Sequence, residues 1–137
     1  TIINRPVEIA GGTYNITCAS VGNPHCVVFC EDPSVLDLET LGPQFEHAKY
    51  FPDRINTEFV RIVNENTLRM RVYERGNGET VACGTGACAA VIAATENGFV
   101  EKGKDITVKL IGGDWWSTTP TMRSSSPATR CWSTRVW

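Results

Sequence analysis

The segment from Ala87 to Thr95, ACAAVIAAT, constrains the fold of this chain more than any other, because it reads as a helix without a polar face. Alanine favours helix, and the pair Asn97-Gly98 that follows is a typical helix stop. We expect a tight loop at 84–86 to precede the helix. A helix that is apolar all round must be buried on every side, so the rest of the chain has to wrap around it.

Strand-like segments lie on both sides of this helix. Turn residues and alternating polarity predict a hairpin around Gly11-Gly12, a β-branched strand from Cys26 to Phe29, and a second hairpin around 64–66 with one buried and one wet face. Another strand is expected within 105–113. The economical arrangement is an α+β fold in which a curved, mostly antiparallel sheet wraps around one central helix.

A second, amphipathic helix is expected after Asp37, which can cap its first turn. Apolar residues recur at helical spacing over 38–48, and Pro52 ends the pattern. Gly42-Pro43 lies inside this stretch, and we expect it to break or restart the helix there.

Composition and charge indicate one soluble globular domain. Of 137 residues, 13 are Lys or Arg and 15 are Asp or Glu, which gives a net charge of −2, and neither sign gathers into blocks. This pattern favours small solutes over nucleic acid or a membrane as partners. No apolar stretch reaches the roughly 20 residues of a membrane span, and the first residues lack the pattern of a secretory signal, so we expect a cytoplasmic protein.

Six cysteines are present, and we expect free thiols, because a chain of this size can form a core without disulfides. The spacings Cys26-x3-Cys30 and Cys83-x4-Cys88, with two isolated histidines, do not suit structural zinc. We therefore expect no metal site.

Cys83 is the candidate reactive residue, because it directly precedes the expected start of the buried helix. Unpaired amides and the helix dipole there favour negative charge, which should lower the pKa of the Cys83 thiol. The amides of Gly84 and Thr85 should bind an anion such as a carboxylate. The alternative is that Cys83 is a small core residue, the role that we expect for Cys88.

Other interpretations of the same region are open. The pattern Gly84-x-Gly86-x-x-Ala89 resembles a nucleotide-binding loop, but it comes late in the chain and without a βαβ unit before it. Arg75, next to Glu74, would suit capture of a second carboxylate, although a charge pair there is ordinarily a solvated turn. Two asparagines and a histidine elsewhere are candidates whose ordinary roles are turn formation and packing: Asn23, Asn56 and His25.

Four segments, in this order and spacing, resemble the second half of diaminopimelate epimerase over about residues 7 to 114: GNPHCVVF, FPDRINTEFVRI, RVYERGNGETVACGTGACAA and VKLIGGD. The resemblance implies a fold of two related α+β halves that close over the substrate, with one cysteine at the start of each central helix. It implies epimerisation between LL- and meso-diaminopimelate, in lysine and peptidoglycan synthesis, by a two-cysteine mechanism without pyridoxal phosphate or any other cofactor.

The resemblance also implies roles for individual residues. Cys83 would be one of the two acid/base cysteines, with His25 beside the cysteine pair. Gly84 and Thr85 would donate amides to the α-carboxylate. The remaining residues would hold the distal amino-acid end of the substrate: Asn23, Asn56, Glu74 and Arg75.

The chain departs from the family pattern because the first half and its cysteine are absent. Cys26 is expected on a strand and Cys88 on the same helix as Cys83, so neither can face Cys83 across a substrate. We therefore expect an inactive fragment whose partner is the missing N-terminal half, and a homodimer is compatible with this view. The alternatives are another racemase or epimerase that needs no pyridoxal phosphate, and a non-catalytic carboxylate-binding module.

The tail from residue 115 differs from everything before it, with four Trp in 23 residues and neither strand alternation nor helical period. With permitted codons, the neighbouring reading frame spells an alternating, strand-like segment. We therefore divide the chain into 1–114, the epimerase-like half, and 115–137, a frameshifted tail. We expect this tail to form no strand ladder and Cys131 to have no function.

Overall fold

The computed structural model describes residues 2–80, 84–101, 105–110, 113–118 and 135–136. Two α-helices and one short 3₁₀ helix are described: α1 (Leu38–Glu46), α2 (Gly84–Glu96) and η1 (Pro33–Val35). The strands are β1 (Arg5–Ile9), β2 (Gly12–Ser20), β3 (Pro24–Phe29), β4 (Asn56–Asn64), β5 (Thr67–Glu74), β6 (Gly78–Thr80), β7 (Asp105–Leu110), β8 (Gly113–Thr118) and β9 (Arg135–Val136).

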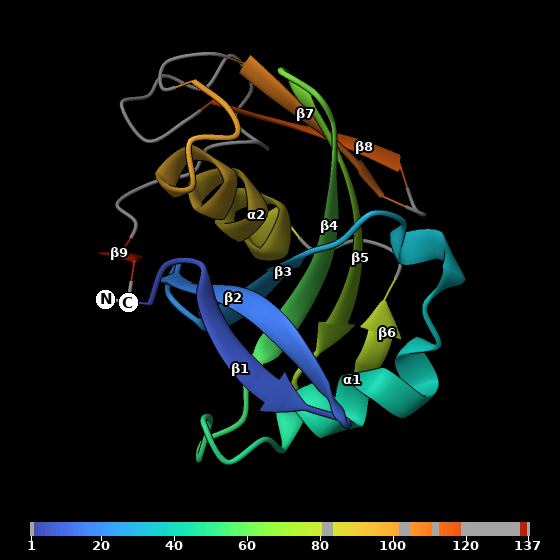
Figure 1. Ribbon diagram of the computed structural model, residues 1–137. Helices are drawn as coiled ribbons and strands as arrows, with labels where there is room; N and C mark the ends of the chain where they lie inside the picture. Colours follow the sequence, from blue (N-terminus) through green and yellow to red (C-terminus); the bar gives the residue numbers. More distant parts are fainter. Residues whose placement is uncertain (1, 81–83, 102–104, 111–112, 119–134, 137) are drawn as a thin grey trace.

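All the described strands belong to one sheet, whose main order is β1-β2-β3-β4-β5-β7-β8. β6 pairs with β5 and β9 pairs with β2, and every pairing is antiparallel except β3 with β4 and β5 with β7. The two parallel pairings need crossovers, and α1 and α2 lie in them. The expected α+β fold is confirmed, and Figure 1 shows the sheet curving around α2.

Helix α2 is buried all round, as its sequence predicts. Every residue from Gly86 to Thr95 is buried, and the apolar side chains pack with those of the sheet strands, among them Val60, Met70 and Ile106. The helix ends before Gly98, whose φ is +76°. It already begins at Gly84, so the expected loop at 84–86 is instead the first turn of the helix.

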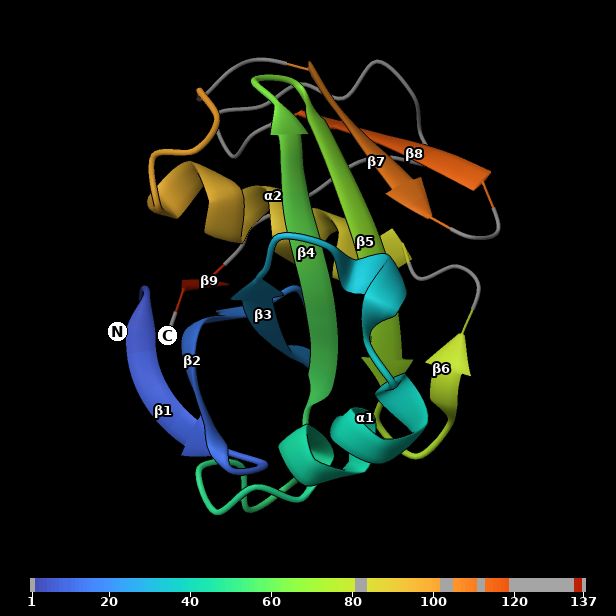
Figure 2. The ribbon, with the colours of Figure 1, turned by 45° about the vertical axis from the view of Figure 1, so that its right-hand side comes forward.

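Helix α1 covers the opposite face of the sheet, so that the sheet separates the two helices (Figure 2). Its Phe45 packs edge-on against Tyr14 and Phe59, with ring centroids 5.1 and 5.3 Å away. Asp37 caps it as expected, but the helix runs through Pro43 without a break. The expected interruption is wrong because α1 is held by the packing of its buried face, which outweighs the missing proline N–H.

The sequence predicts one wet face for the second hairpin, β4–β5, and the position of α1 makes this expectation wrong for part of it. All residues from Asn56 to Val60 are buried, because α1 and its neighbours cover one face of β4 and α2 covers the other. Alternation survives in β5, where Leu68, Met70 and Val72 are buried and Arg69 is exposed. The hairpin therefore has a wet face only towards its tip.

The strand ladder continues into the tail. β8 pairs antiparallel with β7 in a register that places Trp115 opposite Val108 and Trp116 opposite Thr107. The expectation that no ladder forms after residue 114 is therefore wrong for residues 115–118, which pair with the free edge of β7, and for residues 135–136, which pair with β2. Residues 119–134, including Cys131, lie outside the described residues, and the frameshift remains a prediction.

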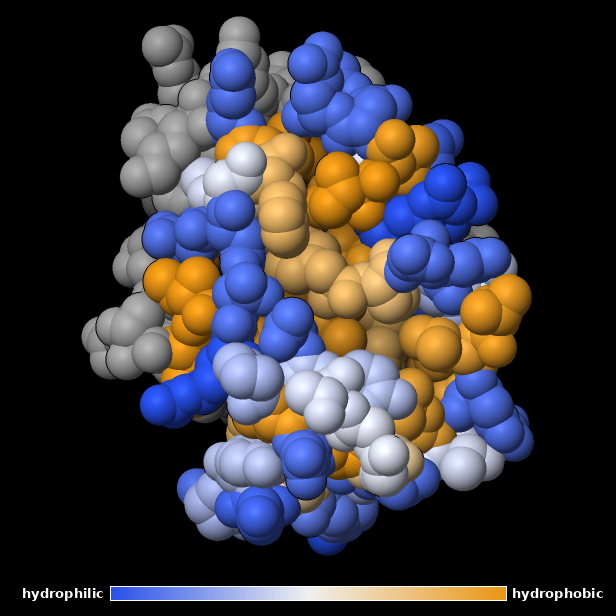
Figure 3. Space-filling model, in the orientation of Figure 1, coloured by the Kyte–Doolittle hydropathy of each residue, from blue (hydrophilic) through white to orange (hydrophobic). Residues whose placement is uncertain are grey.

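On the face shown in Figure 3, hydrophobic residues in the middle are surrounded by hydrophilic ones. Among the described residues, the large apolar side chains with the greatest exposure are those of Val35, Phe99, Tyr50, Val63 and Ile3. Neither α1 nor α2 has the length and apolar character to cross a membrane.

Candidate functional site

The site is built where the parallel strands β3 and β4 begin, on the face that α2 covers. The register sets His25 beside Asn56 and Val27 beside Glu58. Because alternate residues share a face, His25 and Glu58 point to the same side as Val27 and Val60, which pack on α2. His25 Nδ1 lies 2.6 Å from Glu58 Oε1, and both side chains are fully buried.

Asn23 connects this pair to the first turn of α2. Its Oδ1 lies 3.1 Å from His25 Nε2, and its Nδ2 donates a hydrogen bond of 3.5 Å to Thr85 Oγ1. We call Glu58, His25 and Asn23 the buried relay. The relay and its contact to Thr85 bring together three residues that the sequence predicts for the site: Asn23, His25 and Thr85.

Asn56 joins three parts of the chain through its side-chain amide. Nδ2 donates to the carbonyl of Pro24 at 2.9 Å, and Oδ1 accepts from the backbone N–H of Arg75 at 2.7 Å. Asn56 thus fixes the start of β3 against the turn that follows β5. This hydrogen bond brings the Asn56 side chain next to the backbone of Arg75, and the role of both residues in a substrate site stays a prediction.

The turn at Arg75 is also held from α1. The Glu46 carboxylate accepts a hydrogen bond of 2.7 Å from the backbone N–H of Gly76, and Arg75 Nη1 donates to the carbonyl of Asp53 at 3.3 Å. The Arg75 side chain is exposed, whereas Glu46 is buried. The position of Arg75 is therefore determined by α1 as well as by β5.

The surroundings of Glu58 raise its pKa. Burial raises the pKa of Glu58, the charge and hydrogen bond of His25 lower it, and the charge of Glu74 raises it again. Glu74, the last residue of β5, is therefore near enough to Glu58 to act on it electrostatically. Within the described part of the chain, Glu58 Oε2 has no hydrogen-bond partner.

Gly84 and Thr85 are the first two residues of α2. Thr85 is exposed and Gly84 is half-buried. The positive end of a 13-residue helix favours an anion there. Cys83 lies outside the described residues, so its role stays a prediction.

The described cysteines differ from the expected set of free thiols, because Cys88 is disulfide-bonded. Cys18, Cys26 and Cys30 are free. Burial, and then the neighbouring Cys18, raises the pKa of Cys26 well above its ordinary value, and burial followed by the charge of Asp32 raises that of Cys30 to about 11. These two thiols are therefore poor nucleophiles near neutral pH.

Metal-binding residues do not gather in the described part of the chain: no group of three or more His, Cys, Asp or Glu side chains is placed to hold an ion there.

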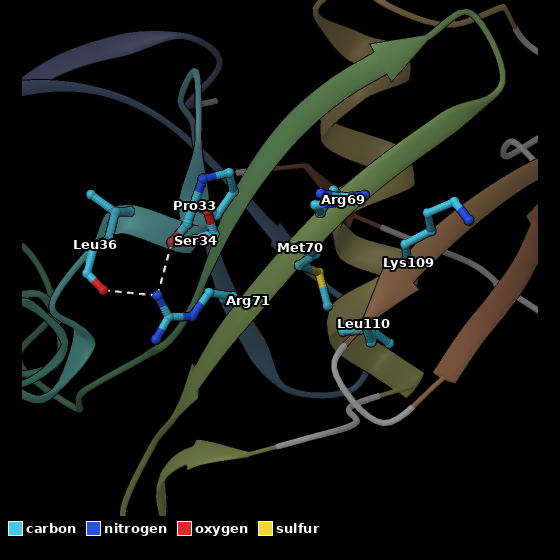
Figure 4. A pocket seen from close by; sticks show the side chains of 8 residues that line it. All are labelled: Pro33, Ser34, Leu36, Arg69, Met70, Arg71, Lys109 and Leu110. Carbon is cyan, nitrogen blue, oxygen red and sulfur yellow. Dashed lines mark hydrogen bonds between the residues drawn. The ribbon is translucent and has the colours of Figure 1, made fainter.

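A cavity of about 570 Å³ lies outside the relay, between η1, β5 and β7 (Figure 4). Arg71 at its edge is fully engaged: it makes two hydrogen bonds of 2.7 and 2.8 Å to Glu79 and two of 2.8 Å to the carbonyls of Pro33 and Leu36. No residue of the relay lines this cavity. We therefore regard it as separate from the predicted site.

Glu58 is the site residue that sequence reasoning missed. Its signal was present, since an acidic residue inside the apolar strand segment INTEFV needs a partner when it is buried. The partner, His25, lies 33 residues earlier and on another strand, so the sequence alone does not identify it.

Comparison with known proteins gives a consistent result. The family model described as diaminopimelate epimerase matches residues 17–122. The chain is 43% identical to the diaminopimelate epimerase of Nostoc punctiforme over 98% of its own length, and 52% identical to that of a Cyanothece species over 82%. It spans 49% and 39% of these two relatives, so about half or less of their length.

Solved structures with the same fold are more distant in sequence. A PhzF-family phenazine biosynthesis protein of Bacillus anthracis matches with a TM-score of 0.53 and 20% identity, covering 80% of this chain and 34% of that one. A PhzF-family protein of Enterococcus faecalis matches with a TM-score of 0.55 and 15% identity, covering 77% and 40%. At these identities the likeness concerns the fold alone.

Proposed function

This chain belongs to the diaminopimelate epimerase family, and we propose that it supplies one half of a cofactor-independent epimerase that interconverts LL- and meso-diaminopimelate. The observation that carries the proposal is the family match over residues 17–122, and it is supported by the hydrogen bond of Asn23 to Thr85 in the first turn of α2. The reaction belongs to lysine and peptidoglycan synthesis.

The reaction requires removal of the α-proton of an amino acid. The α C–H group is a very weak acid. We assign this step to Cys83, which would act as a thiolate while a cysteine of the other half, as a thiol, gives a proton to the opposite face. The first amides of α2, at Gly84 and Thr85, would bind the α-carboxylate and stabilise the developing charge. Closure of the two halves would exclude water from the site.

The distal end of diaminopimelate carries a second ammonium and carboxylate. Glu74 would pair with the ammonium group and Arg75 with the carboxylate, while Asn23 and Asn56 would donate hydrogen bonds. Supporting this, Asn56 fixes the backbone of Arg75, and Glu74 lies near the relay. A racemase for amino acids with uncharged side chains would not need this set.

A second candidate is a non-catalytic module that binds a carboxylate at the start of α2. It would need only the start of α2, where the positive end of the helix dipole favours an anion. A module of this kind would bind amino acids without exchanging their α-protons.

The test measures exchange of the α-proton of diaminopimelate in deuterium oxide. We expect no exchange by this chain alone, and exchange when it is combined with the first half of the Nostoc punctiforme relative. Cys83→Ala in the combined protein should abolish exchange, and Cys30→Ala should leave it in place. Binding of diaminopimelate without exchange by the combined protein would favour the non-catalytic module instead.

A further inference from the structure

We propose that Glu58 is a positioning residue that, through His25, fixes which way the Asn23 side-chain amide points. The proposal rests on the proposed function only where it concerns substrate binding. The geometry behind it is the buried relay, in which a carboxylate, an imidazole and an amide follow one another at 2.6 and 3.1 Å.

The hydrogen-bonding capacity of the relay determines where its protons lie. Both ring nitrogens of His25 face oxygen atoms, Glu58 Oε1 and Asn23 Oδ1. The amide oxygen of Asn23 can only accept, so His25 Nε2 must carry a proton. A second proton must then lie between His25 Nδ1 and Glu58 Oε1. In one arrangement His25 carries it on Nδ1 and Glu58 is a carboxylate. In the other, Glu58 is neutral and donates to Nδ1.

In both arrangements Nε2–H donates to Asn23 Oδ1, and this directs Asn23 Nδ2 towards Thr85. Without the extra proton, a neutral His25 could carry its proton on Nδ1 and offer the Nε2 lone pair to Asn23. The amide would then turn round and present its oxygen to the start of α2. An oxygen in that place could not donate the hydrogen bond to substrate that the proposed function assigns to Asn23.

Burial gives a reason to regard the relay as a positioning device. Both side chains of the Glu58–His25 pair are fully buried, and removing two polar groups from water costs free energy that their attraction often only balances. Glu58 Oε2 in addition has no partner among the described residues. The pair is thus a poor source of stability, but it selects one orientation of the Asn23 amide.

The direct test is nitrogen-15 NMR of the His25 ring in the 137-residue chain. We expect Nε2 to be protonated, and a strongly downfield proton at the short Nδ1 contact. Glu58→Leu can neither donate to nor accept from His25 Nδ1, so it should remove that downfield proton and shift the Asn23 side-chain amide signals. Thr57→Val changes the neighbouring residue, whose buried hydroxyl has no partner among the described residues, and should leave both signals in place.

An unprotonated Nε2 in the unmodified chain would overturn the proposal, and this measurement decides even if Glu58→Leu does not fold. Ring and amide signals that are the same in Glu58→Leu and the unmodified chain would also overturn it. Because no turnover is needed, these outcomes are independent of whether the chain belongs to an epimerase.

Kinetics of the combined two-half protein give a second test. Losing a hydrogen bond to a charged group should raise KM for diaminopimelate about tenfold to a hundredfold in Glu58→Leu, with a much smaller change in kcat. Asn23→Asp presents an oxygen to His25 in either orientation, so Glu58→Leu should have no further effect on KM in that background. An equal effect in both backgrounds would indicate a merely structural role and overturn the proposal.

If the combined protein has no activity even without substitutions, the proposed function fails, while the NMR result on the relay still stands.

Discussion

Asn56 Oδ1 accepts a hydrogen bond of 2.7 Å from the backbone N–H of Arg75. The same side chain donates to the carbonyl of Pro24. A single amide therefore connects β3, β4 and the turn after β5, and two backbone groups depend on it.

Asn56→Ala should lower the free energy of unfolding by about 1–3 kcal/mol, because it leaves the Arg75 N–H and the Pro24 carbonyl without these partners. Urea unfolding would measure the change. Asn64→Ala is the matched control, since its exposed side chain accepts a local bond from Asn66, and it should cost less. Equal effects of the two substitutions would contradict the role of Asn56.

Gly42→Ala should destabilise the protein by about 1–3 kcal/mol, because a Cβ at this position would overlap the ring of Tyr73. Thermal or urea unfolding would measure the loss. Replacing the ring as well, in Gly42→Ala with Tyr73→Leu, should cost less than the sum of the two single substitutions. Simple additivity in this cycle would show that the close approach of α1 to β5 does not matter.

Arg71→Lys should lower the free energy of unfolding by about 1–3 kcal/mol, although it keeps the charge, because Lys cannot form the paired bonds to Glu79 and reach two carbonyls as well. Arg69→Lys is the control, since Arg69 lines the same cavity from an exposed position on β5. A loss of stability in Arg69→Lys as large as in Arg71→Lys would rule out the explanation.

Cys30 should react slowly with iodoacetamide at pH 8 and faster as the pH approaches 11. Its pKa of about 11, against an ordinary 9.0, reduces the thiolate fraction at pH 8 about a hundredfold. Asp32→Asn should lower this pKa and speed the reaction, because it removes a negative charge that opposes the thiolate. Peptide mapping by mass spectrometry would follow Cys30 separately. A rate at pH 8 equal to that of a free thiol would refute the prediction.

The coding DNA tests the boundary at residue 115. We expect the neighbouring frame from that codon to encode a segment with alternating polar and apolar residues that resembles the end of the family. An alternative frame without such a segment would end the frameshift hypothesis. The pairing of β8 with β7 does not decide it, because backbone pairing places few demands on the side chains.

The central helix and the hairpins could be predicted because each depends on local pattern: nine apolar or small residues from Ala87 to Thr95, and turn residues at Gly11 and Asn66. The second layer could not, because no local signal shows that α1 covers β4. The same limit explains Glu58, whose burial depends on a partner in another strand. Predictions of burial from the sequence therefore fail where a residue is covered by a segment that is distant in the chain.

The relay also has a consequence for the order in which the protein folds. Asn23 and Thr85 are 62 positions apart, and His25 and Glu58 are 33 apart, whereas β1–β2 and β4–β5 are joined by short turns. Closing a long loop loses more chain entropy than closing a short one, so contacts between distant segments form later. As the chain leaves the ribosome, both hairpins can assemble first. The polar residues around α2 meet only when the helix docks, so the chemistry of this site is among the last properties that the folding chain acquires.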